Sequence, residues 1–113
     1  MKNRRVPLTE HNLQTAIRQQ LGSKYKIFRT NVGKVLMADG RYFDTGLPRG
    51  HSDLYGYRPD GQIFYIEVKV RPNRPSPEQV EFIEAARAAG ALAGVAYSVV
   101  DAWRIAQGGD PDA

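Results

Sequence analysis

The sequence predicts an α/β fold in which helices pack on a mixed central sheet. Three observations support this prediction: apolar residues at helical spacing near both ends of the chain, a strand–turn–strand pattern in the middle, and a short apolar strand after the second helix. The expected order is helix, three mainly antiparallel strands, helix, strand and a short C-terminal helix, with a crossover that brings the last strand into the sheet. We expect one domain over residues 1–113, with an ordered core from about residue 9 to about residue 107.

The first expected element is a helix over Glu10–Leu21, where apolar residues recur three and four positions apart. Thr9 is a suitable N-cap for this helix, and Gly22 is a suitable stop. The preceding residues Met1–Leu8 are basic and are expected to fray.

A first strand is expected over Tyr25–Thr30, before the residues Asn31-Val32-Gly33 break it. Lys34–Ala38 then leads into a looser stretch that reaches Gly50. The least regular part of the chain is therefore expected between the first strand and residue 50.

Two further strand-like runs, Ser52–Tyr57 and Gln62–Val70, flank the residues Pro59-Asp60-Gly61. Those three residues suit a type I turn followed by a glycine in the left-handed conformation. We therefore expect an antiparallel hairpin.

The register of this hairpin decides where its charged residues lie. A three-residue loop makes Arg58 face Gln62 and places Asp53 directly opposite Glu67, so that both carboxylates share one face. A two-residue Asp-Gly turn would shift the register by one and move Asp53 to the other face.

The second helix has the clearest start signal in the chain. Ser76 is a suitable N-cap, Pro77 occupies the first helical position, and Gln79 stands at the capping-box position. Apolar residues then continue at helical spacing towards Gly90, which is placed to end the helix.

After this helix a short apolar strand is expected over Gly94–Ser98. Ser98, with Asp101 three residues later, can cap a final helix. The last residues, Gly108–Ala113, are expected to be disordered.

The charge is distributed unevenly. The net charge is +4, and residues 1–49 hold ten Lys and Arg against three Asp and Glu, whereas the remainder holds six against nine. Such a positive half attracts polyanions, most commonly nucleic acid, although a basic charge can also serve solubility alone.

The absence of Cys excludes disulfides and thiolate zinc sites, and no apolar run approaches a membrane span. A cytoplasmic setting and no membrane partner are expected.

A metal-dependent active site is predicted at the strand-like run Ile63–Val70, which carries Glu67 and Lys69 two positions apart. Both side chains leave by the same face, and burying a charge is unfavourable unless it is paired or bound to a metal. Two carboxylates, from Asp53 and Glu67, with the backbone carbonyl of Val68 suit Mg²⁺ or Mn²⁺, and the Lys69 ammonium can orient a water or stabilise negative charge. The alternative is a surface Glu and Lys that pair weakly across strands.

The sequence resembles the VRR-Nuc domains of the PD-(D/E)XK nuclease superfamily. Four motifs in order support this resemblance across almost the whole chain: Gly46-Leu47-Pro48-Arg49-Gly50-His51-Ser52-Asp53-Leu54, Ile66-Glu67-Val68-Lys69, Ser76-Pro77-Glu78-Gln79 with Phe82, and Gly94-Val95-Ala96-Tyr97-Ser98. One departure is that Ser52, and not Pro, precedes Asp53. The resemblance implies a restriction-endonuclease-like αβββαβ core and a stand-alone nuclease domain of the kind found in phages.

The resemblance also implies functional residues. Asp53 and Glu67 would be metal ligands and Lys69 the catalytic lysine, with Gln79 near the site and Glu10 at an acidic position of the first helix. Gln79 is explained equally well as a helix-capping side chain, and Glu10 as a favourable charge at a helix N-terminus.

Basic and polar residues near these motifs are candidates for contacts with nucleic acid. The resemblance places the group of Arg29, Asn31, Gly33 and Lys34 near the substrate, where the basic side chains would contact phosphates; the alternative is a solvated turn. Flanking arginines could grip DNA, and strand tyrosines could stack on bases or simply pack. These further candidates are Arg49, Arg71, Arg74, Tyr42, Tyr55, Tyr57 and Tyr65, with His51 as a residue close to the metal.

The predicted function is metal-dependent cleavage of DNA phosphodiester bonds. Resemblance to stand-alone members implies a homodimer that acts on branched DNA such as a four-way junction, with Mg²⁺ or Mn²⁺ as cofactor. The alternatives are a nucleic-acid-binding module without catalysis, a nuclease for RNA or single strands, and an unrelated basic α/β domain.

Overall fold

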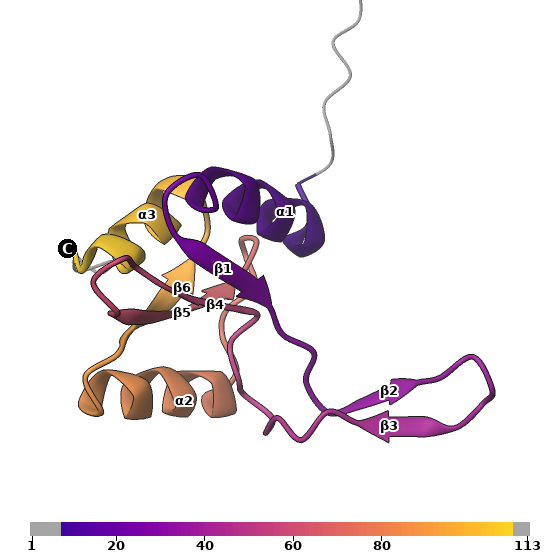
Figure 1. Cartoon of the computed structure of the whole chain (residues 1–113). Helices are drawn as coiled ribbons and strands as arrows, with labels where there is room; N and C mark the ends of the chain where they lie inside the picture. The colour runs from indigo at the N-terminus through magenta and orange to yellow at the C-terminus, as the bar shows by residue number, and fades with distance from the viewer. Residues whose placement is uncertain (1–7, 110–113) are drawn as a thin grey trace, which may run out of the picture.

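The computed structural model describes residues 8–109 and confirms the α/β class and the predicted order of elements. A four-stranded sheet lies between helices, and a separate two-stranded sheet projects from the body (Figure 1). The helices are α1 (Glu10–Leu21), α2 (Pro77–Ala88) and α3 (Val99–Gln107), and the strands are β1 (Lys26–Arg29), β2 (Lys34–Leu36), β3 (Tyr42–Asp44), β4 (Leu54–Tyr57), β5 (Ile63–Val68) and β6 (Leu92–Ala96).

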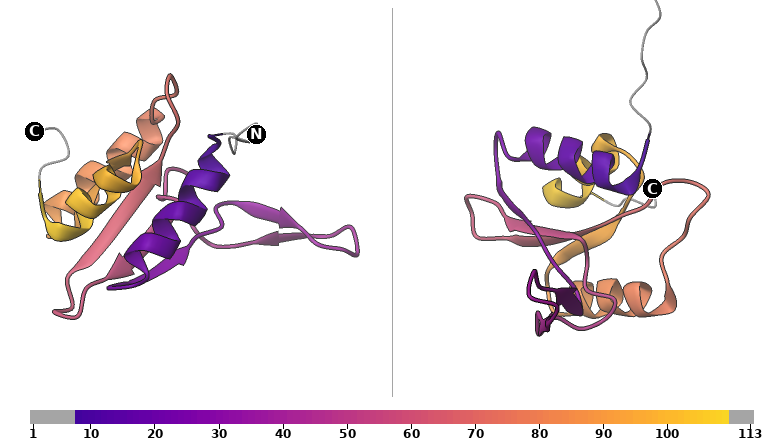
Figure 2. Two further views of the ribbon diagram at one scale, coloured as in Figure 1. Left: turned by 90° about the horizontal axis from the view of Figure 1, so that it is seen from above. Right: turned by 90° about the vertical axis from the view of Figure 1, so that its right-hand side faces the viewer.

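The main sheet has the order β1-β4-β5-β6, and it is mixed as predicted. β4 pairs antiparallel with both β1 and β5, whereas β6 joins β5 in parallel after the crossover through α2. α1 and α3 cover one face of the sheet, and α2 covers part of the other (Figures 1 and 2). The strand ends that carry the predicted site therefore lie between layers of helix.

The predicted helix caps are confirmed at all three helices. The side chains of Thr9, Ser76 and Ser98 each accept a hydrogen bond from a backbone N–H of the first turn, and Ser76 with Gln79 forms a complete capping box. Within residues 8–109 no helix is long and apolar enough to cross a membrane.

The predicted hairpin register is also confirmed. Leu54 pairs with Ile66 and Tyr57 with Ile63, and the N–H of Arg58 donates to the carbonyl of Gln62 at 3.0 Å. This is the register of a three-residue loop, so Asp53, just before β4, stands opposite Glu67.

The hydrophobic core lies between the sheet and the pair α1 and α3. Leu54, Phe64 and Ile66 send fully buried side chains to this face, because alternate residues of a strand point the same way. β4 approaches β1 closely at Gly56, where a Cβ atom would lie 2.0 Å from the carbonyl oxygen of Lys26. Only glycine fits there, so any larger residue would push the two strands apart.

Several predicted boundaries differ from the structure, most clearly those of the last strand and of the C-terminal tail. The last strand is Leu92–Ala96 and not Gly94–Ser98, because Ser98 serves as the N-cap of α3 and the N–H of Tyr97 donates to the Asp101 carboxylate. A strand buried on both faces shows no alternation that would mark its ends.

Disorder was expected from Gly108 onward, but Gly108 and Gly109 close the last helix. Gly108 adopts a left-handed conformation with φ of 87°, and the N–H of Gly109 donates to the carbonyl of Arg104 at 2.8 Å. The rest of that predicted disordered tail, and residues 1–7 of the segment expected to fray, lie outside the described residues.

The looser stretch expected before residue 50 contains the largest difference from the prediction. β2 and β3 form an antiparallel hairpin, here called the arm (residues 34–44), which projects from the body (Figure 2). Leu36, Tyr42 and Phe43 are 60%, 68% and 57% exposed, so large apolar side chains of the arm face the surroundings.

Candidate active site

Asp53 and Glu67 come together at the end of the β4–β5 ladder. The carboxylate oxygen Oδ2 of Asp53 accepts a hydrogen bond from the N–H of Val68 at 2.9 Å, which fixes the Asp53 side chain against β5. The two acids predicted from the sequence therefore share one face of the sheet.

Thr30, just after β1, holds the backbone of this acid in place. Its Oγ1 donates to the carbonyl of Ser52 at 2.6 Å, and its N–H donates to the carbonyl of Asp53 at 2.9 Å. Ser52 itself is fully buried, and its hydroxyl donates to the carbonyl of Leu54. Sequence reasoning missed the support by Thr30 because it acts across 22 or more positions of the chain, where no local motif connects the residues.

Glu67 is 1% exposed, and its two carboxylate oxygens have different surroundings. Oε1 accepts a hydrogen bond from Nε2 of Gln79 at 3.0 Å and lies 3.9 Å from the ammonium of Lys69. Oε2 is buried and has no hydrogen-bond partner among residues 8–109. A buried carboxylate oxygen without a partner is unfavourable unless another group satisfies it.

The environment of Glu67 favours the protonated acid. Burial, and then the neighbouring charge of Asp53, raise the pKa of Glu67 from 4.5 to about 9, against the opposing effect of Lys69. A positive charge placed between the two acids would reverse this preference, because it stabilises both carboxylates.

Gln79 fills both of the roles between which the sequence left a choice. Its Oε1 accepts from the N–H of Ser76 at 2.8 Å, which completes the capping box, and this bond directs its NH₂ group towards Glu67. The start of α2 thus fixes the orientation of the amide that holds Glu67.

The donor set fits a hard divalent cation. The N–H of Val68 points towards Asp53, and the carbonyl of a strand residue points to the same side as its N–H, so the Val68 carbonyl is directed towards Asp53 as well. The three oxygen donors predicted from Asp53, Glu67 and Val68 are thus close together, and Glu67 Oε2 still lacks a partner. Mg²⁺ and Mn²⁺ prefer such oxygens and retain waters. Residues 8–109 contain no group of three or more His, Asp and Glu side chains that could hold a metal ion.

Glu10 lies close enough to influence the same site. It is half-buried in the first turn of α1, and its negative charge contributes to the raised pKa of Glu67. The structure therefore brings an acid from the other face of the sheet towards the two strand carboxylates.

The basic and polar candidates surround this end of the sheet without entering it. Arg29 and Asn31 flank Thr30, and Arg49 lies in the loop that leads to Asp53. The other three lie on other segments: Arg71 and Arg74 in the loop before α2, and Lys34 at the start of the arm. The guanidinium of Arg71 lies 4.3 Å from the ring centroid of Tyr97, so packing accounts for part of its position.

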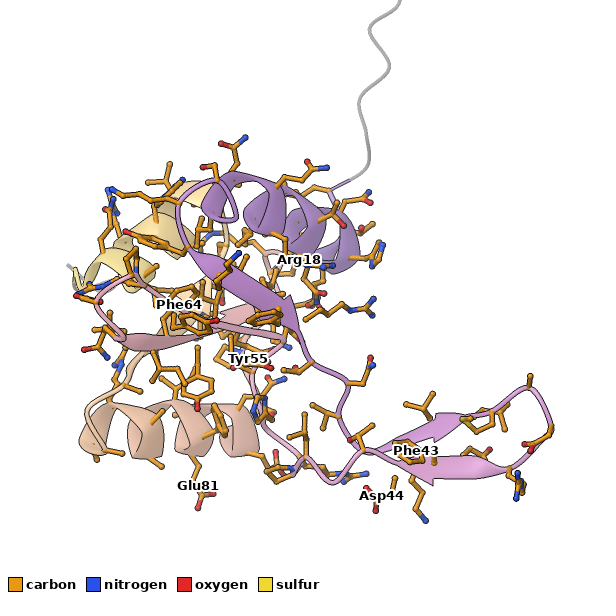
Figure 3. The ribbon with its side chains drawn as sticks, viewed as in Figure 1. Arg18, Phe43, Asp44, Tyr55, Phe64 and Glu81 are labelled. Atoms are coloured by element: carbon orange, nitrogen blue, oxygen red, sulfur yellow. The ribbon has the colours of Figure 1, made fainter. Side chains whose placement is uncertain are left out.

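His51 lies among aromatic rings. Its ring centroid is 4.6 Å from that of Phe82 and 5.8 Å from that of Tyr65, and its Nδ1 is 2.9 Å from the carbonyl of Ser52. The side chains of this region, including Tyr55, fill the space between the sheet and α2 (Figure 3). His51 is positioned by this packing, two residues before Asp53.

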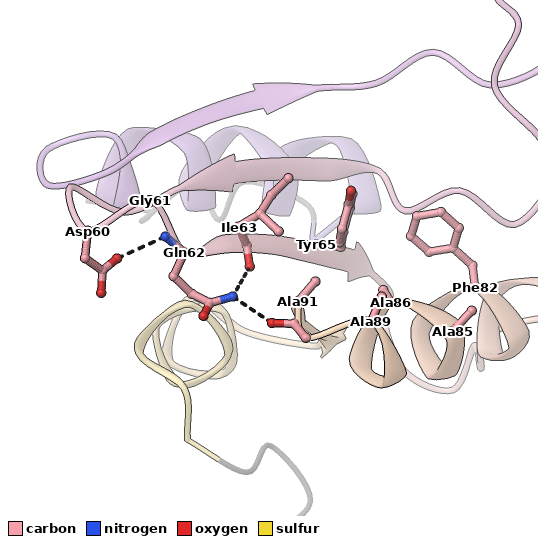
Figure 4. A pocket seen from close by; sticks show the side chains of 11 residues that line it. Asp60, Gly61, Gln62, Ile63, Tyr65, Phe82, Ala85, Ala86, Ala89 and Ala91 are labelled. Carbon is pink, nitrogen blue, oxygen red and sulfur yellow. Dashed lines mark hydrogen bonds between the residues drawn. The ribbon is translucent and has the colours of Figure 1, made fainter.

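A cavity of about 680 Å³ opens on the same face of the sheet but away from the carboxylates. It runs between α2 and the β4–β5 turn, from Tyr65 and Phe82 past small alanines to Asp60 and Gln62 (Figure 4). None of the acids of the candidate site lines it, so this groove is separate from the carboxylates.

Comparison with known proteins agrees with this architecture. No protein-family model and no curated protein matches the sequence. A solved structure described as a "VRR_NUC domain" is similar to the chain, with 22% sequence identity and a TM-score of 0.62, and the likeness covers 87% of this chain and 94% of that one. The protein therefore has the fold of a VRR_NUC domain.

Proposed function

We propose that this protein is a nuclease that hydrolyses DNA phosphodiester bonds with the help of a divalent cation. The observation that supports this most strongly is the buried Glu67, whose Oε2 lacks a partner beside a second carboxylate and a lysine. A purely structural acid would have both oxygens hydrogen-bonded or exposed to water. The likeness of fold to a VRR_NUC domain supports the same proposal.

Each residue has a defined task in this proposal. Asp53, Glu67 and the Val68 carbonyl would hold Mg²⁺ or Mn²⁺, which supplies charge neutralisation and water activation when bound. The Lys69 ammonium, 3.9 Å from Glu67 Oε1, stabilises the negative charge that develops on the phosphate as water attacks phosphorus. Gln79 keeps the Glu67 carboxylate in position, and the negative charge of Glu10 would help to balance the charge of the cation.

The basic residues near the site would bind the DNA backbone. Arg29, Asn31 and Arg49 lie on segments that meet at Asp53, and exposed side chains at such positions can contact phosphates on either side of the cut. Arg71 and Arg74 would extend this contact along the loop before α2, and Lys34 would extend it only to the base of the arm. This distribution favours a polyanionic substrate that crosses the end of the sheet.

We further propose that two copies act together on branched DNA such as a four-way junction. A two-fold dimer would suit paired, symmetric cuts. The arm supports self-association, because it exposes Leu36, Tyr42 and Phe43 and its charges balance, with Lys34 and Arg41 against Asp39 and Asp44. A neutral surface with exposed aromatic side chains fits a protein partner better than phosphates.

The test is a cleavage assay with end-labelled linear, flapped and four-way DNA in Mg²⁺, Mn²⁺ or EDTA. Lys69→Ala, purified in parallel, reports any contaminating nuclease, and Lys24→Ala, at an exposed lysine of the α1–β1 turn, is the matched control. We expect cutting that requires metal, persists in Lys24→Ala and is lost in Lys69→Ala, with the four-way DNA preferred.

Two outcomes would overturn parts of this proposal. Metal-dependent cutting that Lys69→Ala retains would remove Lys69 from the mechanism. Folded protein that binds DNA but never cuts it would make the chain a nucleic-acid-binding module.

A further inference from the structure

α2 covers only part of the sheet face that carries the carboxylates, and β1 and β4 lie beyond the helix (Figure 1). The residues that these two strands send to this face are Lys26 and three aromatic residues. Phe28 pairs with Tyr55, and Tyr57 follows two positions later on the same side. Phe28, on the edge strand β1, and Tyr57, at the end of β4, are 41% and 46% exposed, so two large aromatic side chains face the surroundings here.

These rings form a continuous series. Phe28 lies 6.3 Å from Tyr57 and 5.4 Å from Tyr55, and Tyr55 lies 6.5 Å from His51, all measured between ring centroids. From His51 the series then continues to Tyr65 of β5 and Phe82 of α2. We call the exposed rings of Phe28 and Tyr57, together with the half-buried ring of Tyr55, the aromatic face.

The aromatic face leads directly to the candidate active site. Tyr55 stands two residues after Asp53 and Tyr65 two residues before Glu67, so rings and carboxylates leave the sheet on the same side. An extended polymer bound over the rings would therefore continue to the carboxylates on the same face of the sheet.

The charge beside these rings is positive. Lys26 pairs with Tyr57 and lies two residues before Phe28, which places its side chain on the same face. Lys26 carries the only charge among the residues within β1 and β4 that point to this side, and Asp53, just before β4, is the acid of the candidate site to which the rings lead. Flat apolar rings next to a cation suit bases with their phosphates better than an acidic or purely apolar partner.

We propose that the aromatic face binds unpaired bases of a single-stranded nucleic acid and delivers the adjoining phosphate to Asp53 and Glu67. This inference rests on the proposed nuclease function and adds that bases left unpaired at the branch point are held next to the cut. Bases stack on Phe28 and Tyr57, and Lys26 contacts the backbone. Stacking on aromatic side chains is tolerant of sequence, so the enzyme recognises strand structure and not a base order.

Binding without metal tests the aromatic face separately from catalysis. In EDTA, fluorescence anisotropy gives the affinity for a dye-labelled oligo(dT) and for a blunt duplex of equal length. Phe28→Leu and Tyr57→Leu should each weaken oligo(dT) binding about tenfold, because one stacked base contributes on the order of 1–3 kcal/mol. Affinity for the blunt duplex should change less than about twofold, and Tyr57→Trp should restore single-strand binding.

Val100→Ala is the matched control, since Val100 is a more exposed apolar side chain, at 58%, that lies on α3 and outside the aromatic face. It should leave oligo(dT) binding unchanged, and melting curves should show that all variants remain folded. Wild-type affinity for oligo(dT) in both leucine variants would refute the inference, as would an equal loss for the duplex. Dissociation of a dimer by Phe28→Leu would assign this face to a second copy of the chain. A failure of cleavage alone would affect the proposed function and not this binding.

Discussion

At the scale of residues, the carboxylate of Glu67 is in an unfavourable environment, which a bound metal ion would relieve. Its carboxylate is buried next to Asp53, so the folded protein without metal favours the acid form up to about pH 9, whereas the unfolded chain ionises near pH 4.5. Stability from this group is therefore complete below about pH 4.5 and is lost as the pH rises towards 9, since the folded state retains a proton that the unfolded state releases.

This loss of stability with rising pH gives a direct prediction for Glu67→Gln. The amide keeps an oxygen that can accept from Gln79 but carries no charge, so in EDTA the variant should be more stable than the wild type at pH 7, by about 3 kcal/mol, and nearly equal to it at pH 4.5. Urea unfolding at several pH values measures the difference. A difference that does not grow with pH would show that Glu67 ionises normally.

Gln79 gives a second prediction, because its cap and its contact with Glu67 can be separated. Ser76→Ala removes only the capping hydroxyl, whereas Gln79→Ala removes the capping amide and the donor to Glu67. Each should lose about 1 kcal/mol of stability, but cleavage should fall about 10- to 100-fold only in Gln79→Ala. Equal loss of activity in both variants would mean that the cap alone matters.

The residues of the site differ in how far the sequence could predict them. Asp53 and Glu67 could be placed opposite each other because turn residues and alternation are local signals that set the register. The support of Asp53 by Thr30 could not be predicted, since it joins segments that meet only in the folded chain. The roles of the predicted site residues in catalysis remain predictions.

At the scale of elements, local signals predicted the helices and the hairpin well and the arm poorly. Thr9, Ser76 and Ser98 cap helices through side chains that lie next to the bonds they form, so a single sequence is sufficient. The arm exposes apolar residues on both of its faces, and it therefore lacks the contrast between a buried and a solvated side that reveals a strand.

The arm should be dispensable for folding. No residue of the hydrophobic core lies in residues 34–44, and the N–H of Thr45 donates to the carbonyl of Gly33 at 2.9 Å, so the base of the arm is already closed. Replacing residues 34–44 by two glycines should shift the melting temperature by less than about 5 °C, or about 1 kcal/mol. Calorimetry measures this, and an unfolded product would contradict it.

The same deletion tests the proposed assembly. Sedimentation should show that the wild type forms a dimer and that the shortened chain is a monomer, because the exposed apolar side chains leave with the arm. A dimer that survives the deletion would place the interface elsewhere on the molecule.

At the scale of the whole molecule, Arg29 of the basic half of the sequence lies at the end of the sheet that carries the carboxylates, because it pairs with Leu54, the residue after Asp53. Arg29 lies at this end, whereas Arg104 is exposed on α3, which covers the face of the sheet opposite α2. DNA affinity should fall with salt, and Arg29→Gln should reduce the magnitude of the log–log slope by about one, which corresponds to one phosphate contact. Arg104→Gln is the matched control and should leave the slope unchanged; equal effects would indicate diffuse attraction without a defined path for DNA.

The central claim is that Asp53 and Glu67 hold the divalent cation on which cleavage depends. The most direct test is the single-turnover rate of DNA cleavage as a function of Mg²⁺ concentration, for the wild type and for Asp53→Asn. The account predicts a rate that saturates with Mg²⁺ in the wild type and a variant that is at least about 100-fold slower and needs more Mg²⁺. A rate that does not depend on Mg²⁺, or an identical curve for Asp53→Asn, would contradict it.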